Sequence, residues 1–240
     1  MTLWLTQQIL KEHKRDGFIS ALVFGKQGSG KTTYALITAK EVYEKLGFEK
    51  PWETALERLY FELPEAIPLL KQAFYERAKI PVIIFDDASI WFSKYYWYTD
   101  VQKAFFKIYA LIRTLVTAVI FTTPSPHDIS FFLREKSWKK IKITKNGVET
   151  KGPKKGVRRA RAWLFKTDFK RDKNGDFTTA VEKEAVDDFY LEIPTEILNR
   201  YMEKRYKAIE RLLSEIEQIL QKIQPEDAVE TTLPGSGNGG

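Results

Sequence analysis

The chain has 240 residues, of which 43% are hydrophobic, enough to bury one sizeable core and an appendage. It has no cysteine, so disulfides and thiolate metal sites are excluded, and its two histidines lack the spacing of a zinc site. The net charge is +7, and no apolar run reaches the roughly 18 residues that a transmembrane helix needs.

The chain begins with a predicted amphipathic helix over residues 1–17, which lacks the basic start and apolar centre of a signal peptide. Residues 19–24 form an apolar, partly β-branched run that predicts a buried strand. Residues 33–46 follow with helical spacing and end at Gly47. A short loop therefore joins a strand directly to a helix.

That loop has the sequence G-x-x-x-x-G-K-T. In this context its backbone N–H groups and the helix N-terminus are expected to surround a phosphate chain. Lys31 is expected to reach the β- and γ-phosphates, and the Thr32 hydroxyl to bind Mg²⁺. The alternative is a glycine-rich turn that binds nothing. The predicted nucleotide-binding residues are Gly25, Lys26, Gln27, Gly28, Ser29, Gly30, Lys31, Thr32 and Thr33.

A second apolar run, residues 81–85, ends in Asp86 and Asp87. Its lack of alternation predicts a central parallel strand, and α/β proteins bind ligands where such strands end. We expect Asp86 to hold the Mg²⁺ shell. Asp87 lies where many hydrolysing P-loop proteins carry a glutamate that polarises the attacking water. Because aspartate is one methylene shorter, hydrolysis is expected to be slow or to need a partner.

A third buried strand is predicted over residues 116–121, and polar residues follow it. Thr122, with Thr123 as the second choice, is expected to contact the γ-phosphate or the attacking water. Alternatively, a threonine simply ends the strand. Arg113 and Arg134 flank this strand and are candidate arginine fingers that act in trans, or else plain surface cations.

Residues 91–98 are unusually aromatic, which suits a core, a subunit interface or base stacking, and the sequence leaves all three open.

The basic excess lies in residues 134–173, where 16 Lys and Arg stand against four Asp and Glu. Alternating strands and turn signals at 146–147 and 173–176 predict β-hairpins with a charged tip. Such a block suits phosphate backbones, although a solvated charged surface is the alternative. The predicted nucleic-acid-binding residues are Lys139, Lys140, Lys142, Lys145, Lys151, Lys154, Lys155, Arg158, Arg159 and Arg161.

The predicted organisation is a helix over 1–17, a core over 18–133, a basic β-rich appendage over 134–193, a long helix over 194–224 and a disordered tail over 225–240. Thr195 is the expected N-cap of the long helix. The helix also has a predicted heptad seam, interrupted at Arg205. We expect this seam either to pack on its own domain or to pair with another chain. The seam is Leu198, Met202, Arg205, Ile209, Leu212, Ile216, Ile219 and Ile223.

Together, the P-loop, the IIFDD run at residues 83–87, the threonines after the third strand and Arg134 resemble the additional-strand P-loop ATPases. This group includes AAA+ proteins and FtsK/HerA-like DNA motors, and the resemblance covers residues 18–143. The D-D-A-x-x-W-F sequence at residues 86–92 resembles small ATPases of archaeal viruses and plasmids, some described as similar to the bacterial replication initiator. Two departures from the AAA+ pattern are Asp87 in place of glutamate and no recognisable three-helix lid.

The resemblance implies a three-layer αβα fold with a mainly parallel sheet, and Mg-dependent ATP hydrolysis coupled to work on DNA. It also implies a homo-oligomer in the host cytoplasm. Two other functions remain open: an assembly or morphogenesis factor that acts on a protein partner, for which the C-terminal helix is a candidate contact, and a small-molecule kinase.

Overall fold

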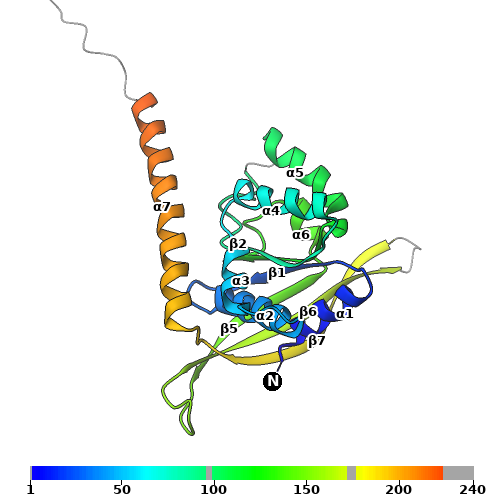
Figure 1. Ribbon diagram of the computed structural model, residues 1–240, viewed down its shortest axis with the longest axis vertical. Coiled ribbons are helices and arrows are strands. Elements are labelled where there is room, and N and C mark those ends of the chain that lie inside the picture. The colour runs from blue at the N-terminus through cyan, green and yellow to red at the C-terminus, as the bar shows by residue number, and fades with distance from the viewer. Residues whose placement is uncertain (1, 96–98, 172–176, 224–240) are drawn as a thin grey trace, which may run out of the picture. The chain divides into compact units, whose positions relative to one another are not determined.

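Seven strands form one sheet in the order β2-β3-β4-β1-β5-β6-β7 in the computed structural model, which describes residues 2–95, 99–171 and 177–223 (Figure 1). Pairing is parallel from β2 to β5 and antiparallel from β5 to β7. The strands are β1 (Ile19–Phe24), β2 (Leu59–Tyr60), β3 (Ile80–Phe85), β4 (Val116–Thr123), β5 (Lys139–Val148), β6 (Arg158–Arg171) and β7 (Phe177–Tyr190).

Helices cover both faces of the parallel part of the sheet, so the predicted αβα layering is confirmed. The first three helices lie on one face and α4, α5 and α6 on the other (Figure 1). The helices are α1 (Trp4–Lys14), α2 (Lys31–Lys45), α3 (Pro51–Glu57), α4 (Leu63–Glu76), α5 (Asp100–Leu111), the 3-10 turn η1 (Ile112–Thr114), α6 (Phe131–Lys136) and α7 (Thr195–Ile223).

An aromatic cluster fixes the strands that carry the candidate site. Phe85 at the end of β3 stacks on Phe121 of β4, with ring centroids 5.6 Å apart. Phe92, from the aromatic stretch after β3, is fully buried against both rings and against Phe105 of α5. Tyr95 is exposed, and residues 96–98 of that stretch lie outside the described residues. The core interpretation therefore holds for the start of the aromatic stretch.

Strand β4 lies between β1, which leads into the P-loop, and β3, which carries the aspartates. Because the strands are parallel, their carboxyl ends meet at one edge of the sheet. The P-loop, Asp86 and Thr122 therefore lie together at that edge.

The basic strands continue the core sheet. β5 pairs in parallel with β1, so the boundary predicted between residues 133 and 134 falls inside α6. The hairpin predicted at Asn146 and Gly147 is wrong, because these residues form a bulge within β5. Gly147 has a φ of 74°, which suits the bulge, and residues 149–157 make the turn instead. The turn predicted at residues 173–176 lies outside the described residues.

Contacts divide the chain into two units, Met1–Asn199 and Arg200–Gly240. In the described part of the second unit, α7 is one continuous helix. It begins at Thr195, so this residue is the first of the helix rather than its N-cap. The tail predicted to be disordered, residues 225–240, lies outside the described residues. Within the described ranges, no helix combines the length and apolar character needed to cross a bilayer.

Candidate nucleotide-binding site

The loop between β1 and α2 takes a path that only glycine allows at two points. Gly25 has a φ of 152° and Gly30 a φ of 101°. A Cβ at Gly25 would lie 2.4 Å from the carbonyl oxygen of Ile143, and one at Gly30 would lie 2.2 Å from a methyl carbon of Leu191. The P-loop is therefore packed directly against β5 and against the segment that follows β7.

The loop has the chemistry of a phosphate site. Gly30 occupies the N-cap of α2 and has no side chain with which to bond the first N–H groups of the helix. The Ser29 hydroxyl is buried without a hydrogen-bond partner among the described residues. The Lys31 ammonium is held at the loop by the Lys26 carbonyl, 3.3 Å away. Helix N–H groups, a buried hydroxyl and an ammonium together suit an anionic phosphate chain.

Asp86 is fully buried at the end of β3 and accepts hydrogen bonds from two hydroxyls. Thr32 Oγ1 lies 2.9 Å from Asp86 Oδ1 and 3.2 Å from Oδ2. Thr122 Oγ1, at the end of β4, donates to Asp86 Oδ1 at 2.6 Å. A carboxylate beside a threonine hydroxyl is a hard oxygen donor set, which is the kind Mg²⁺ prefers. The residues present therefore fit a bound Mg²⁺.

Asp87 has a left-handed backbone, with a φ of 46°. This conformation is uncommon and costly for a residue other than glycine, and such outliers gather at functional sites. Its N–H donates to Thr122 Oγ1 at 2.9 Å, so one hydroxyl fixes both aspartates. Thr123 instead donates to the Ser125 carbonyl at 3.0 Å. Of the two threonines, Thr122 is the one that the structure brings to the aspartates.

Sequence comparisons place these residues among viral proteins. No family model matches the chain. The uncharacterized protein B-251 of Sulfolobus spindle-shape virus 1 is 46% identical over 220 residues, which are 91% of this chain and 86% of B-251. The chain belongs to the B-251 family. The uncharacterized protein ORF286 of Acidianus two-tailed virus is 27% identical over 146 residues, which are 59% of this chain and 49% of ORF286.

Two solved structures resemble the fold of this B-251 family chain at low sequence identity. The genome packaging NTPase B204 of Sulfolobus turreted icosahedral virus 2, in complex with ATP-gammaS, covers 68% of this chain and 97% of its own, with a TM-score of 0.39 and 10% identity. The N-terminal domain of zonular occludens toxin from Neisseria meningitidis covers 76% of this chain and 98% of its own, with a TM-score of 0.36 and 14% identity. The P-loop NTPase assignment itself rests on this chain's own strand order and loop geometry.

The structure gives the two candidate arginine fingers contacts of their own. Arg113 is in η1, before β4, and it acts electrostatically on Asp16, which precedes β1. It therefore lies at the amino edge of the parallel strands, opposite the P-loop. Arg134, in α6, contacts His127 at 3.3 Å and lies 5.3 Å from the Phe131 ring centroid.

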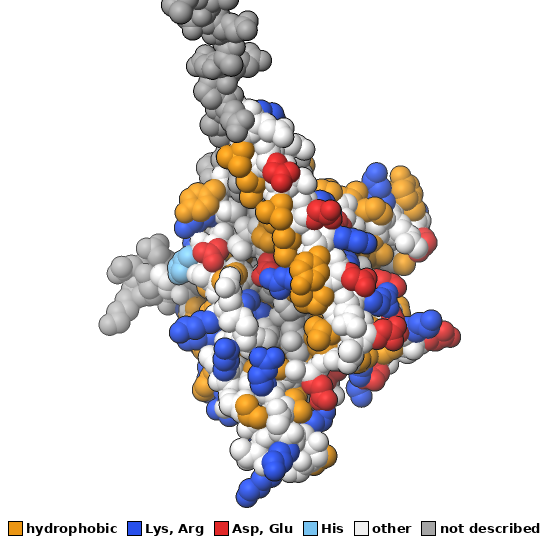
Figure 2. Space-filling model, turned by 90° about the vertical axis from the view of Figure 1, so that its left-hand side faces the viewer, with side chains coloured by type: hydrophobic (Ala, Val, Ile, Leu, Met, Phe, Trp, Pro, Cys, Tyr) orange, Lys and Arg blue, Asp and Glu red, His pale blue; other side chains and the backbone are white. Residues whose placement is uncertain are grey.

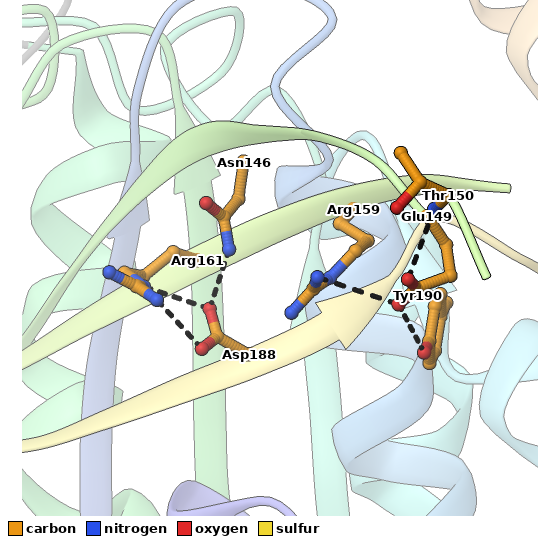
Figure 3. Close-up of polar contacts among 7 residues, drawn as sticks. All are labelled: Asn146, Glu149, Thr150, Arg159, Arg161, Asp188 and Tyr190. Atoms are coloured by element: carbon orange, nitrogen blue, oxygen red, sulfur yellow. Dashed lines mark hydrogen bonds and ion pairs between the residues drawn. The ribbon is translucent and has the colours of Figure 1, made fainter.

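Acidic residues of β7, of the segment after it and of the β5–β6 turn neutralise part of the basic block (Figure 3). Arg161 makes a two-pronged ion pair with Asp188, and this guanidinium lowers the pKa of Asp188. Arg159 lies 3.4 Å from Glu149, whose pKa is lowered mainly by a hydrogen bond from Tyr190. Lys139 and Lys154 pair with Glu184 and Glu192. Sequence reasoning missed Glu184, Asp188 and Glu192 because the basic stretch was counted only as far as residue 173.

The other six predicted nucleic-acid-binding residues make no ion pair within the described part of the chain. Lys140 is half-buried, and the rest are exposed on β5, in the turn before β6 and at the start of β6. Figure 2 shows Lys and Arg side chains gathered on the lower part of the face that it displays, where the β5–β6 turn lies. This set is Lys140, Lys142, Lys145, Lys151, Lys155 and Arg158.

Proposed function

We propose that this chain is a Mg-dependent ATPase that couples ATP binding and hydrolysis to work on DNA. The observation that carries the proposal is the bonded set of Thr32, Asp86, Thr122 and Asp87 at the carboxyl ends of adjacent strands, beside the P-loop. Hydrogen bonds among these buried polar groups fix their orientation. The groups are therefore preorganised, as phosphoryl transfer requires.

In the proposed reaction, the P-loop N–H groups and Lys31 bind the phosphate chain. Thr32 and Asp86 would hold Mg²⁺, which would neutralise charge on the phosphates. Asp87 accepts a hydrogen bond from the attacking water. The water oxygen forms a bond to the γ-phosphorus, and the bond from that phosphorus to the β–γ bridging oxygen breaks. The products are ADP and inorganic phosphate, and the water proton passes to solvent through Asp87 or the phosphate.

The DNA part of the proposal rests on the position of the basic turn. β5 runs parallel to β1, with Lys142 level with Phe24, so β5 continues past the P-loop edge into the turn over residues 149–157. That turn carries Lys151 and Lys155, both exposed. Because Ile143 and Leu191 back the P-loop glycines, a shift of the turn is transmitted to the nucleotide loop through packed atoms.

Salt dependence tests the DNA surface. Replacing Lys151 and Lys155 with alanine is expected to weaken DNA binding and to reduce the slope of log affinity against log salt by about 2, since each phosphate contact contributes roughly 0.9. The matched control replaces Lys166 and Lys170 with alanine, which changes the net charge by the same amount. These two lysines differ from Lys151 and Lys155 because both pair with Glu182. Equal slopes in the two double variants would rule out the turn as the DNA contact.

Steady-state ATP hydrolysis with and without single- and double-stranded DNA tests the coupling. Stimulation by one form supports the proposal and identifies the substrate. Hydrolysis that ignores both forms would favour the protein-partner alternative, an assembly factor. Phosphate transfer to a small acceptor instead of water would favour a kinase.

A further inference from the structure

Helix α7 has 29 residues and carries a continuous apolar stripe over residues 202–220. The stripe's members recur at alternating steps of four and three, which is the a and d pattern of a heptad. We call this set the α7 seam; it consists of Met202, Tyr206, Ile209, Leu213, Ile216 and Leu220. The seam expected from the sequence shares Met202, Ile209 and Ile216 with this one. It alternated them with Leu198, Arg205, Leu212 and Ile219, so Arg205 interrupted it, whereas the α7 seam is uninterrupted.

The α7 seam is half-buried at Met202 and exposed from Tyr206 onward. Leu213, Ile216 and Leu220 are 56%, 52% and 55% exposed, and Tyr206 is 63% exposed. A stripe of aligned aliphatic side chains of this length is far from the scattered apolar residues of an ordinary surface, and it marks an interaction site. Two apolar residues in every seven give an average spacing of 3.5 residues, slightly less than the 3.6 residues of one helical turn. A sustained spacing of this kind suits a left-handed supercoil.

We propose that the α7 seam binds the same seam of other copies of this chain, in a parallel coiled coil of three or four helices. Identical helices supply the same a and d residues at every level, so the seam is complementary to itself. This inference does not depend on ATP hydrolysis or on DNA.

The charges that flank the seam set the orientation. Glu203, Glu210 and Glu217 occupy successive e positions, and Arg205 occupies a g position. In an antiparallel pair the e positions face each other, so glutamate would lie against glutamate. In a parallel pair g faces the next e of the partner, which brings Arg205 toward Glu210 of the other copy. Parallel alignment therefore avoids the repulsion and adds an attraction.

The residues of the seam set the number of helices. Leucine occupies a at 213 and 220, and isoleucine occupies d at 209 and 216. Leucine at a with isoleucine at d favours trimers and tetramers over dimers. Leu212 and Ile219 at g positions widen the apolar face beyond what a two-helix seam covers. A bundle of three or four helices buries this wider face.

Sedimentation equilibrium of the full chain, without nucleotide, tests the assembly. The wild type is expected to have the mass of three or four 28.0 kDa chains. Leu213→Lys places a charge in the seam and is expected to raise the dissociation constant by about 100-fold or more, since burying an unpaired charge is costly. The matched control Ser214→Lys adds the same charge at a b position and should keep the wild-type mass. A monomeric or dimeric wild type, or equal dissociation by the two variants, would overturn the proposal.

A single cysteine tests the orientation, because the chain has none of its own. Leu220→Cys is expected to form an intermolecular disulfide on oxidation, since like positions meet in a parallel bundle. In an antiparallel arrangement centred on Leu213, the two cysteines would be roughly 20 Å apart along the axis, at 1.5 Å per residue. An oligomeric variant that fails to cross-link would refute the parallel arrangement.

Discussion

The Thr122 hydroxyl joins the two aspartates of the candidate site, so Thr122→Val is an informative change. Valine has almost the same shape as threonine but no hydroxyl. The variant loses the 2.6 Å hydrogen bond to Asp86 and leaves the Asp87 N–H without the acceptor that it has at 2.9 Å. Because Thr122 is fully buried, water does not easily replace either bond.

The expected cost follows from these two bonds. Losing a hydrogen bond to a charged group, or leaving a buried N–H unpaired, costs roughly 1–3 kcal/mol each. Together we expect a loss of about 2–6 kcal/mol in the free energy of unfolding, which lowers Tm by about 4–24 °C in a chain of this size. Displacing a catalytic group by about 1 Å can cost roughly 100-fold in rate, so hydrolysis is expected to fall by about 10- to 100-fold. Affinity for ATP should change little, because the P-loop itself is intact.

Thr123→Val is the matched control, since Thr123 is equally buried and lies next in the same strand. It loses only the bond to the Ser125 carbonyl, so its Tm should fall while turnover per folded molecule stays near the wild-type value. The assays are thermal unfolding, ATP binding and phosphate release, with the rates measured well below both Tm values. Equal turnover in the two valine variants would refute the role given to Thr122.

The remaining predictions concern the P-loop and the arginine finger. Gly25→Ala is expected to reduce nucleotide binding at least about 10-fold, because the new Cβ meets the backbone oxygen of Ile143. The control Gly47→Ala, also at positive φ but with open space around it, should bind nucleotide normally. Equal nucleotide binding by the two variants would contradict the packing argument. Arg134→Ala is expected to hydrolyse ATP poorly while still binding it, and mixing it with Lys31→Ala should restore part of the activity if each site is completed by a neighbour. No recovery on mixing would exclude Arg134 as a finger in trans.

Much of the parallel core could be predicted from the sequence. The strands at Ile19–Phe24, Ile80–Phe85 and Val116–Thr123 were apparent because buried parallel strands are continuous apolar runs. The outer strands were harder, since a bulge at Gly147 gives the same sequence signal as a hairpin turn. Nothing local indicated that β5 pairs with β1, because that pairing joins segments more than 100 residues apart.

The site, too, could be predicted from the sequence only in part. Residue types that carry their own chemistry, such as Lys31 and Asp86, could be found from spacing alone. The choice of Thr122 over Thr123 became clear only from side-chain direction, since neighbouring residues in a strand point to opposite faces. The ion pairs of the basic block depend on the register of β7 against β6, which sequence spacing does not determine.

The most direct test of the account is Mg-dependent phosphate release from ATP by the purified full chain, with Lys31→Ala as the control. The account predicts measurable hydrolysis by the wild type that is lost in the variant and on removal of Mg²⁺ by chelation. Hydrolysis at the wild-type rate by Lys31→Ala, or a wild-type protein that neither binds nor hydrolyses ATP, would contradict the assignment of this loop as the nucleotide site.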